Sequence, residues 1–259
     1  MPPPLKDAPG DERAEFDAYA ADYQGGVEHP LKRFLGGSLK NFLEVKVQWL
    51  LKDLARHPVR SAARPEDLKL LDFGCGTGEF LQLLRSHGFP GHLEGCDASE
   101  GMLGEAVRRW REGERPLFHV AGLKHALPFA DDSYDVIVAC CVFHHIGVSR
   151  RQEICRELLR IIKPNGRLVI FEHNPHNPLT RFMVRRTPID RHAALVTPSD
   201  MRHAVVSVGL THARSASLLF FPPRLTWLRN TEEWLAAIPL GGQYACVSEK
   251  PSRGTSFAN

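Results

Sequence analysis

Between Leu68 and Phe171 the sequence alternates short apolar runs with longer amphipathic ones. The apolar runs predict five buried strands, at residues 68–73, 92–97, 116–121, 134–143 and 167–173. Three segments between them have helical periodicity, at residues 77–87, after the predicted N-cap Ser99, and at residues 150–163. Ser149 and Gln152 match a capping box at the start of the last of these helices, and we expect the run 163–166 to end it. Near-continuous apolar strands that alternate with helices form parallel sheets covered on both faces. The sequence therefore predicts a doubly wound α/β fold.

The flanks of this region add further elements. Two helical segments precede Leu68, at about residues 12–23 and 37–56. A Pro-rich stretch follows His173, and then a helix at 199–208, a strand through Phe221 and a last strand at about 243–249. We expect a mostly parallel seven-stranded sheet with helices on both faces and an N-terminal helical cap.

The run Asp72-Phe73-Gly74-Cys75-Gly76-Thr77-Gly78 stands directly between a predicted strand and a helix. Glycines at such a turn let the backbone bend tightly and approach a ligand closely. The spacing is GxGxG after an acid, which differs from the GxGxxG of dinucleotide-binding folds, and no GK[ST] follows as in a P-loop. A nicotinamide-dependent oxidoreductase therefore remains only an alternative.

This turn and three later motifs resemble those of the class I S-adenosylmethionine-dependent methyltransferases. LLDFGCGTGEF resembles the first motif, and Asp97 in GCDASEGML matches the acid that holds the ribose hydroxyls. LPFADDSYDVIVACCVFHHI and ELLRIIKPNGRLVI resemble the later segments, so the resemblance covers roughly residues 16–250. It implies methyl transfer from S-adenosylmethionine to a small organic acceptor, with O-, N- and C-methylation all open.

The resemblance divides the chain into a helical cap (1–67), a cofactor-binding core (68–174), an acceptor-side cap with closing strands (175–250) and a flexible tail (251–259). It also implies a set of cofactor contacts: Tyr23, Asp72, Gly74, Cys75, Gly76, Asp97, Ala98, Met102, Leu123, Lys124 and Cys140. Leu123 stands where the family often has an Asp for the adenine amino group. A cofactor-binding interaction protein without catalysis is therefore a second alternative.

Four titratable residues follow two neighbouring predicted strands. His144-His145 comes after the fourth strand and Glu172-His173 closes the fifth. Parallel strands bring these ends to one edge of the sheet, and histidine is suited to act as a general base near pH 7. We expect these four residues to be catalytic. The six cysteines show no CxxC pair, so the sequence predicts no metal site and favours a reducing cytoplasm.

The charge is small overall but unevenly distributed. The chain has 33 basic and 30 acidic residues, yet eight Arg, no Lys and two acids lie between Pro175 and Arg229. We expect Arg181, Arg185 and Arg186 to bind a carboxylate or phosphate of the acceptor, the alternative being solvated helix faces. The balance gives no indication of nucleic-acid binding. The longest apolar run has eight residues, whereas a membrane-spanning helix needs about 20, so we expect no membrane insertion.

Overall fold

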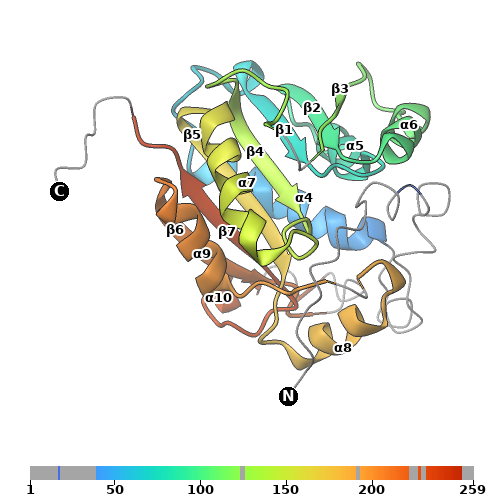
Figure 1. The fold of residues 1–259 in the computed structure, drawn as a ribbon, viewed down its shortest axis with the longest axis vertical. Helices are drawn as coiled ribbons and strands as arrows, with labels where there is room; N and C mark the ends of the chain where they lie inside the picture. The colour runs from blue at the N-terminus through green and yellow to red at the C-terminus, as the bar shows by residue number, and fades with distance from the viewer. Residues whose placement is uncertain are drawn as a thin grey trace.

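The computed structural model describes residue 17 and residues 39–122, 126–190, 193–221, 227–228 and 232–252 (Figure 1). Its strands are β1 (Lys69–Phe73), β2 (His92–Asp97), β3 (Leu117–Val120), β4 (Tyr134–Cys140), β5 (Ile162–His173), β6 (Thr211–Leu218) and β7 (Gln243–Glu249). Its α-helices are α4 (Leu39–Arg56), α5 (Glu79–Ser86), α6 (Glu100–Arg109), α7 (Val148–Ile161), α8 (Pro178–Arg186), α9 (Pro198–Ser207) and α10 (Glu232–Leu235). Two short 3₁₀ turns complete the described elements, at Pro65–Asp67 (η1) and Pro188–Asp190 (η2).

All seven strands form one sheet in the order β3-β2-β1-β4-β5-β7-β6. The first five pair in parallel, whereas β7 is antiparallel to both β5 and β6. The α/β class is confirmed, and the sheet is mixed because β7 is reversed. Asp72 in the central strand β1 pairs with Gly95 of β2 and Val138 of β4, so these strands end at one edge.

The side chains of the central strands alternate between two hydrophobic cores, one on each face of the sheet. Leu71 and Ile137 belong to the core that contains residues of α7 and α9. Leu70 and Val136 belong to the core that contains residues of α4, α5 and α6. Figure 1 shows α7 and α9 in front of the sheet and α4 behind it. Helices therefore cover both faces, as the apolar strands predict.

The helix α7 begins and ends differently from the sequence-based expectation. Its N-cap is Gly147, and no side chain caps the helix, so the predicted capping box of Ser149 and Gln152 is wrong. The helix ends at Ile161, and the run 163–166, which we expect to be a turn, lies within β5. Asn165 there has a φ of 62°, which lets the backbone bend inside the strand.

The N-terminal helical cap is described only in part. Of the predicted helix at about 12–23, only Asp17 falls among the described residues, whereas α4 matches the predicted segment 37–56. Asp53 of α4 forms a buried ion pair with Arg167 of β5, at 3.1 Å. The helix is thus attached to the sheet by charge as well as by apolar packing. The division of the whole chain into functional parts stays a prediction.

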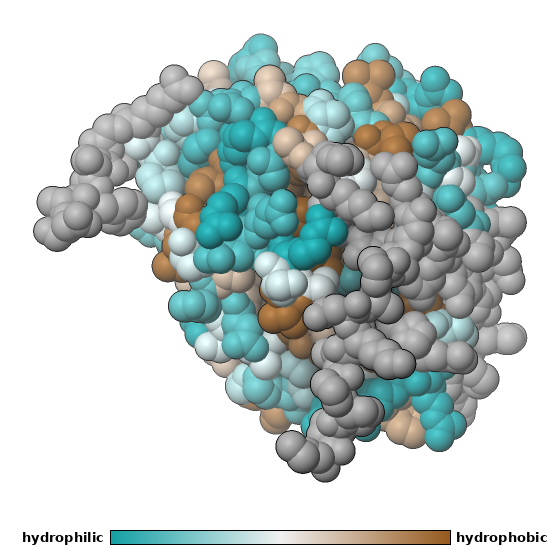
Figure 2. All heavy atoms as spheres, viewed as in Figure 1, coloured by the Kyte–Doolittle hydropathy of each residue, from teal (hydrophilic) through white to brown (hydrophobic). Residues whose placement is uncertain are grey.

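The described part of the chain contains no helix that is both long and apolar enough to cross a bilayer. On the coloured part of the face in Figure 2, hydrophilic residues are interspersed with hydrophobic ones.

Candidate active site

The glycine turn after β1 is fixed to the end of β2 by the carboxylate of Asp97. Asp97 Oδ2 accepts a hydrogen bond from the amide of Gly76 at 2.8 Å, and Oδ1 accepts one from the amide of Ser99 at 2.9 Å. Ser99 is the N-cap of α6, as expected, and its hydroxyl accepts a bond from the Met102 amide. One side chain therefore orders both the turn and the start of α6. The Ser99 hydroxyl also donates to Asp17, the described residue of the N-terminal segment.

Glycine is required in the turn for two reasons. Gly74 and Gly76 have φ angles of 74° and 51°, which favour glycine. A Cβ on Gly74 would lie 2.5 Å from Val142 Cγ2, but a Cβ on Gly76 would meet no atom of the described residues within 4 Å. Within the described part of the chain, the backbone at Gly76 therefore borders open space, where a ligand could approach closely.

Asp72 lies beside this turn with an unsatisfied carboxylate. It is buried, and its Oδ1 has no hydrogen-bond partner among the described residues. Burial and the negative charge of Asp97 raise the pKa of Asp72 to about 8, although Lys46 opposes this shift. A buried carboxylate oxygen without a partner is unusual and suits a cationic or hydroxyl-bearing ligand. The open glycine turn and this orphaned oxygen fit S-adenosylmethionine, which carries a sulfonium, an ammonium and two ribose hydroxyls.

The remaining predicted cofactor contacts lie in different surroundings. Cys75 belongs to the glycine turn, and its side chain packs in the core that contains residues of α4, α5 and α6. Only its backbone is therefore available to a ligand at the turn. Met102 is buried on α6, Ala98 is half-buried after β2, and Cys140 ends β4. Tyr23, Leu123 and Lys124 lie outside the described residues.

The four predicted catalytic residues do come together at the ends of β4 and β5. His144 Nδ1 donates to Glu172 Oε2 at 2.6 Å, and Glu172 Oε1 accepts from the amide of Phe143 at 2.7 Å. The ring of His144 lies 4.1 Å from that of His145 and 5.1 Å from that of His173, between centroids. His144 and Glu172 are fully buried.

A fifth residue, Asp190 of η2, completes this cluster. Its Oδ1 lies 3.4 Å from His144 Nε2 and 3.5 Å from His145 Nε2. No motif in the sequence indicates Asp190, although it is one of only two acids, beside eight arginines, between 175 and 229. That imbalance is the signal that could have identified it.

The pKa values of the two adjacent histidines are shifted in opposite directions. Burial lowers the pKa of His144, but Glu172 and Asp190 outweigh burial and raise it to about 10. Burial also raises the pKa of Glu172, yet the histidines bring it down to about 2. Burial and the charge of His144 lower the pKa of His145 to about 3. With nothing else bound, His144 therefore carries the positive charge and His145 is neutral.

Lys46 of α4 links this cluster to the cofactor side. It is buried, and its Nζ donates to Cys141 Sγ at 3.2 Å. Cys141 follows β4 with a φ of 58°. Burial raises the pKa of the Cys141 thiol, but Lys46 and His173 outweigh it and lower the pKa to about 6. Cys141 is therefore unlike a cysteine that only fills an apolar core.

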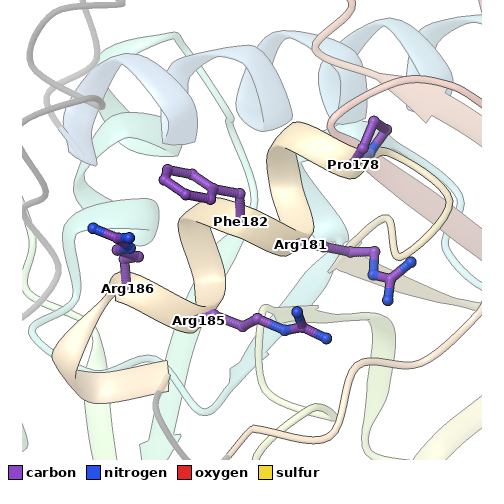
Figure 3. Close-up of a pocket in the computed structure, with 5 residues that line it drawn as sticks. All are labelled: Pro178, Arg181, Phe182, Arg185 and Arg186. Atoms are coloured by element: carbon purple, nitrogen blue, oxygen red, sulfur yellow. The ribbon is translucent and has the colours of Figure 1, made fainter.

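The three predicted substrate arginines lie on α8, but they do not all point to the same side of the helix. In Figure 3, Arg181 and Arg185 point to one side of the helix, whereas Arg186 and Phe182 point to the other. The Arg186 guanidinium lies 4.8 Å from the centre of the Phe182 ring. These residues and Pro178 line an open hollow of about 360 Å³. Among the described residues, no carboxylate forms an ion pair with any of the three arginines.

Comparison with known proteins identifies the family. Residues 71–170 match the family described as "Methyltransferase domain". The chain is 31% identical to the demethylmenaquinone methyltransferase of Clavibacter sepedonicus over 174 residues, which cover 66% of this chain and 67% of that protein. The chain belongs to the class I S-adenosylmethionine-dependent methyltransferases. S-adenosylmethionine is the cofactor of this family, as the sequence motifs imply.

A further relative and a solved structure define the extent of the similarity to this methyltransferase. It is 38% identical to the demethylmenaquinone methyltransferase of Thermotoga maritima over 109 residues, which cover 42% of this chain and 45% of that protein. It thus spans about half the length of several curated relatives that it matches. A chain solved in complex with the Haloferax volcanii Trm112 methyltransferase activator has the same fold, with a TM-score of 0.64, 24% identity, and coverage of 92% of this chain and 98% of that one.

Proposed function

We propose that this methyltransferase transfers the methyl group of S-adenosylmethionine to a small organic acceptor, and that His145 removes the acceptor proton. One observation carries the proposal. The glycine turn held by Asp97 and the cluster around His144 lie at the carboxyl ends of neighbouring strands of one sheet. Ligands of open α/β sheets bind at this edge.

Asp97 and Asp72 are the residues that would hold the cofactor. Asp97 accepts the amides of Gly76 and Ser99 on different oxygens, and a carboxylate has about four acceptor sites, so Asp97 can still accept from a ribose hydroxyl. The unpartnered oxygen of Asp72 would accept a hydrogen bond from a cationic group of the cofactor, and Lys46 would pair with the cofactor's carboxylate. When bound, S-adenosylmethionine supplies an electrophilic methyl carbon, whose bond to sulfur breaks with the electron pair staying on sulfur as the bond to the acceptor forms.

His145 is the best-placed base of the cluster because it can be reached. Its side chain is 22% exposed, whereas that of His144 is 1% exposed. His144 is enclosed by Glu172 and Asp190 and is a positioning residue for its neighbour. His145 would take the proton of an acceptor hydroxyl, amine or activated carbon through Nε2. Because burial and the charge of His144 lower its pKa to about 3, His145 is a weak base, and we expect its contribution at the lower end of the roughly 100- to 10,000-fold range of general-base catalysis.

The acceptor class is supported by the surface and by the relatives. Arg181 and Arg185 point the same way from α8 and can bind one carboxylate or phosphate together. Two relatives are demethylmenaquinone methyltransferases, which act on a small organic molecule by name. We propose a small acceptor with an anionic group.

The test is the transfer of label from methyl-labelled S-adenosylmethionine to a component of a fractionated metabolite extract. With an active fraction as acceptor, the turnover of the His145→Ala variant should be at least about 100-fold lower than that of the wild type. The His203→Ala variant, changed on the exposed face of α9, should keep the wild-type rate. Unchanged turnover in the His145→Ala variant would show that His145 is not a general base and that the enzyme transfers the methyl group by positioning the acceptor. Absence of transfer with any fraction would favour the non-catalytic alternative.

A further inference from the structure

We propose that His144, His173 and Asp190 form a binding site for one divalent transition-metal cation. The three residues come from separate parts of the chain: the segment after β4, the end of β5, and η2. Each offers one ligand atom, and these atoms all lie within 4.8 Å of one another.

The spacing of the ligand atoms suits a cation of this size. Two ligands that each lie about 2.1 Å from a tetrahedral metal are roughly 3.4 Å apart. His144 Nε2 and Asp190 Oδ1 are separated by 3.4 Å. The ring nitrogen of His173 is farther away, within the 4.8 Å limit, so a small rotation of that ring would complete the set.

A second observation is independent of the spacing. His144 Nε2 is buried and has no hydrogen-bond partner among the described residues. Its separation from Asp190 is too long for a well-formed hydrogen bond. Buried polar atoms nearly always have a partner, so this nitrogen points to an occupant between the imidazole and the carboxylate.

The surroundings of His144 are those of a metal ligand. Histidines that bind metals almost always donate their other ring N–H to a carboxylate or carbonyl, which fixes the tautomer and the ring. His144 Nδ1 donates to Glu172 at 2.6 Å, and Glu172 is itself held by the Phe143 amide. This arrangement directs Nε2 at Asp190, and a cation bound there would displace the proton that Nε2 otherwise carries. Glu172 thus acts as a positioning residue for His144.

The donor set selects the kind of cation. Two imidazoles and one carboxylate suit Zn²⁺ and neighbouring first-row metals, whereas Mg²⁺ and Ca²⁺ prefer oxygen ligands throughout. Three protein ligands leave at least one coordination position open, as in catalytic zinc sites. His145 Nε2, 3.5 Å from the same Asp190 oxygen, borders that position. An acceptor oxygen bound there would lose its proton to His145 more readily.

This last role rests on the proposed function, but cation binding does not, and the two are tested separately. The full chain is freed of metal with a chelator and titrated with Zn²⁺ by calorimetry and with Co²⁺ by visible absorption. We expect one equivalent of each, with the absorption of a nitrogen- and oxygen-ligated Co²⁺ site. His144→Ala, His173→Ala and Asp190→Asn should each weaken binding at least about 100-fold, and Glu172→Gln about 10- to 100-fold.

Two matched variants control the result. His203→Ala removes an exposed histidine of α9, and Cys141→Ser removes the thiol beside His173; both should bind as the wild type does. No stoichiometric binding by the wild-type chain would overturn the proposal, even if a ligand variant failed to fold. Full affinity in folded ligand variants would overturn it too, as would a sulfur-to-cobalt absorption band lost in Cys141→Ser. A wild-type chain that binds the cation but does not bind S-adenosylmethionine would instead count against the proposed function.

Discussion

The carboxylate of Asp97 accepts the amide hydrogen of Gly76 at 2.8 Å, and so joins the end of β2 to the turn after β1. The two residues are 21 positions apart in the sequence. The same side chain holds the Ser99 amide. The geometry of the cofactor turn therefore depends on an acid from the next strand, not on the glycines alone.

Replacing Asp97 by Ala should abolish measurable S-adenosylmethionine binding in calorimetry. The variant loses the proposed ribose contact and two hydrogen bonds to a charged group, each of about 1.5–3 kcal/mol. Glu100→Ala, an exposed change in the first turn of α6, should bind as the wild type does. Wild-type affinity in a folded Asp97→Ala protein would contradict the cofactor assignment.

The two glycines of the turn should respond differently to alanine. Gly74→Ala combines a left-handed φ with a clash against Val142 and should reduce the free energy of unfolding by about 2–4 kcal/mol. Gly76→Ala has the same kind of strain but no clash, so its loss should be about 1–2 kcal/mol. Its methyl group enters the open space, so S-adenosylmethionine affinity should fall more than stability. Urea unfolding and calorimetry on both variants measure the contrast; equal losses in both would refute it.

The affinity for S-adenosylmethionine should increase with pH through the titration of Asp72. The pKa of this carboxyl is raised to about 8, so the group is mostly protonated below that pH, whereas a cationic ligand binds the ionised form. Affinity should therefore rise by up to about tenfold per pH unit below the pKa and level off above it. Calorimetry between about pH 6 and pH 9 tests this, and Asp72→Asn should remove the dependence. A flat profile in the wild type would show that Asp72 does not ionise on binding.

The arginines of α8 provide a matched comparison on one helix. Arg181→Ala and Arg185→Ala should each raise KM for an anionic acceptor by about 5- to 50-fold, since a hydrogen bond to a charged group contributes about 1–2 kcal/mol. Arg186→Ala should leave KM unchanged, because that side chain points away and stacks on Phe182. Equal effects of all three changes would indicate a general effect of charge instead of a defined anion site.

The buried pair of Asp53 and Arg167 should matter for stability. Both side chains are at most 5% exposed, so Asp53→Ala leaves a buried arginine with one fewer counter-charge. The expected loss is about 3–5 kcal/mol in urea unfolding. Glu66→Ala removes one of the two acidic partners of the exposed Arg64, whose contact with Asp67 stays, and should cost less than about 1 kcal/mol. Similar losses for the two variants would mean that α4 is held by apolar packing alone.

Apolar periodicity predicted the helices and strands well where a segment has either a clear strand pattern or a clear helical pattern. The predicted bounds of β2 and β7 coincide with the observed ones, because Gly91 directly precedes β2 and Gly242 directly precedes β7. The pattern could not orient β7, since a buried strand looks the same in either direction. The start of α7 was wrong because Ser149 matches a capping box in letters but already lies inside the helix.

The site was predictable only where its residues end a strand. His144, His145, Glu172 and His173 were found because two neighbouring strand ends meet at one edge. Asp190 and Lys46 were not, since their positions depend on how η2 and α4 pack on the sheet. The split of Arg186 from Arg181 depends on helical phase, because side chains five positions apart point in different directions.

The position of β7 constrains the order in which this protein can be completed during synthesis. β6 is joined to the sheet only through β7, and β7 lies between it and β5. Until residues 243–249 leave the ribosome, one edge of β5 is exposed and β6 has no strand to pair with. The nascent chain therefore presents an unpaired edge of β5, and later an unpaired β6 as well, until β7 has been synthesised, and these are the surfaces that a chaperone would have to shield.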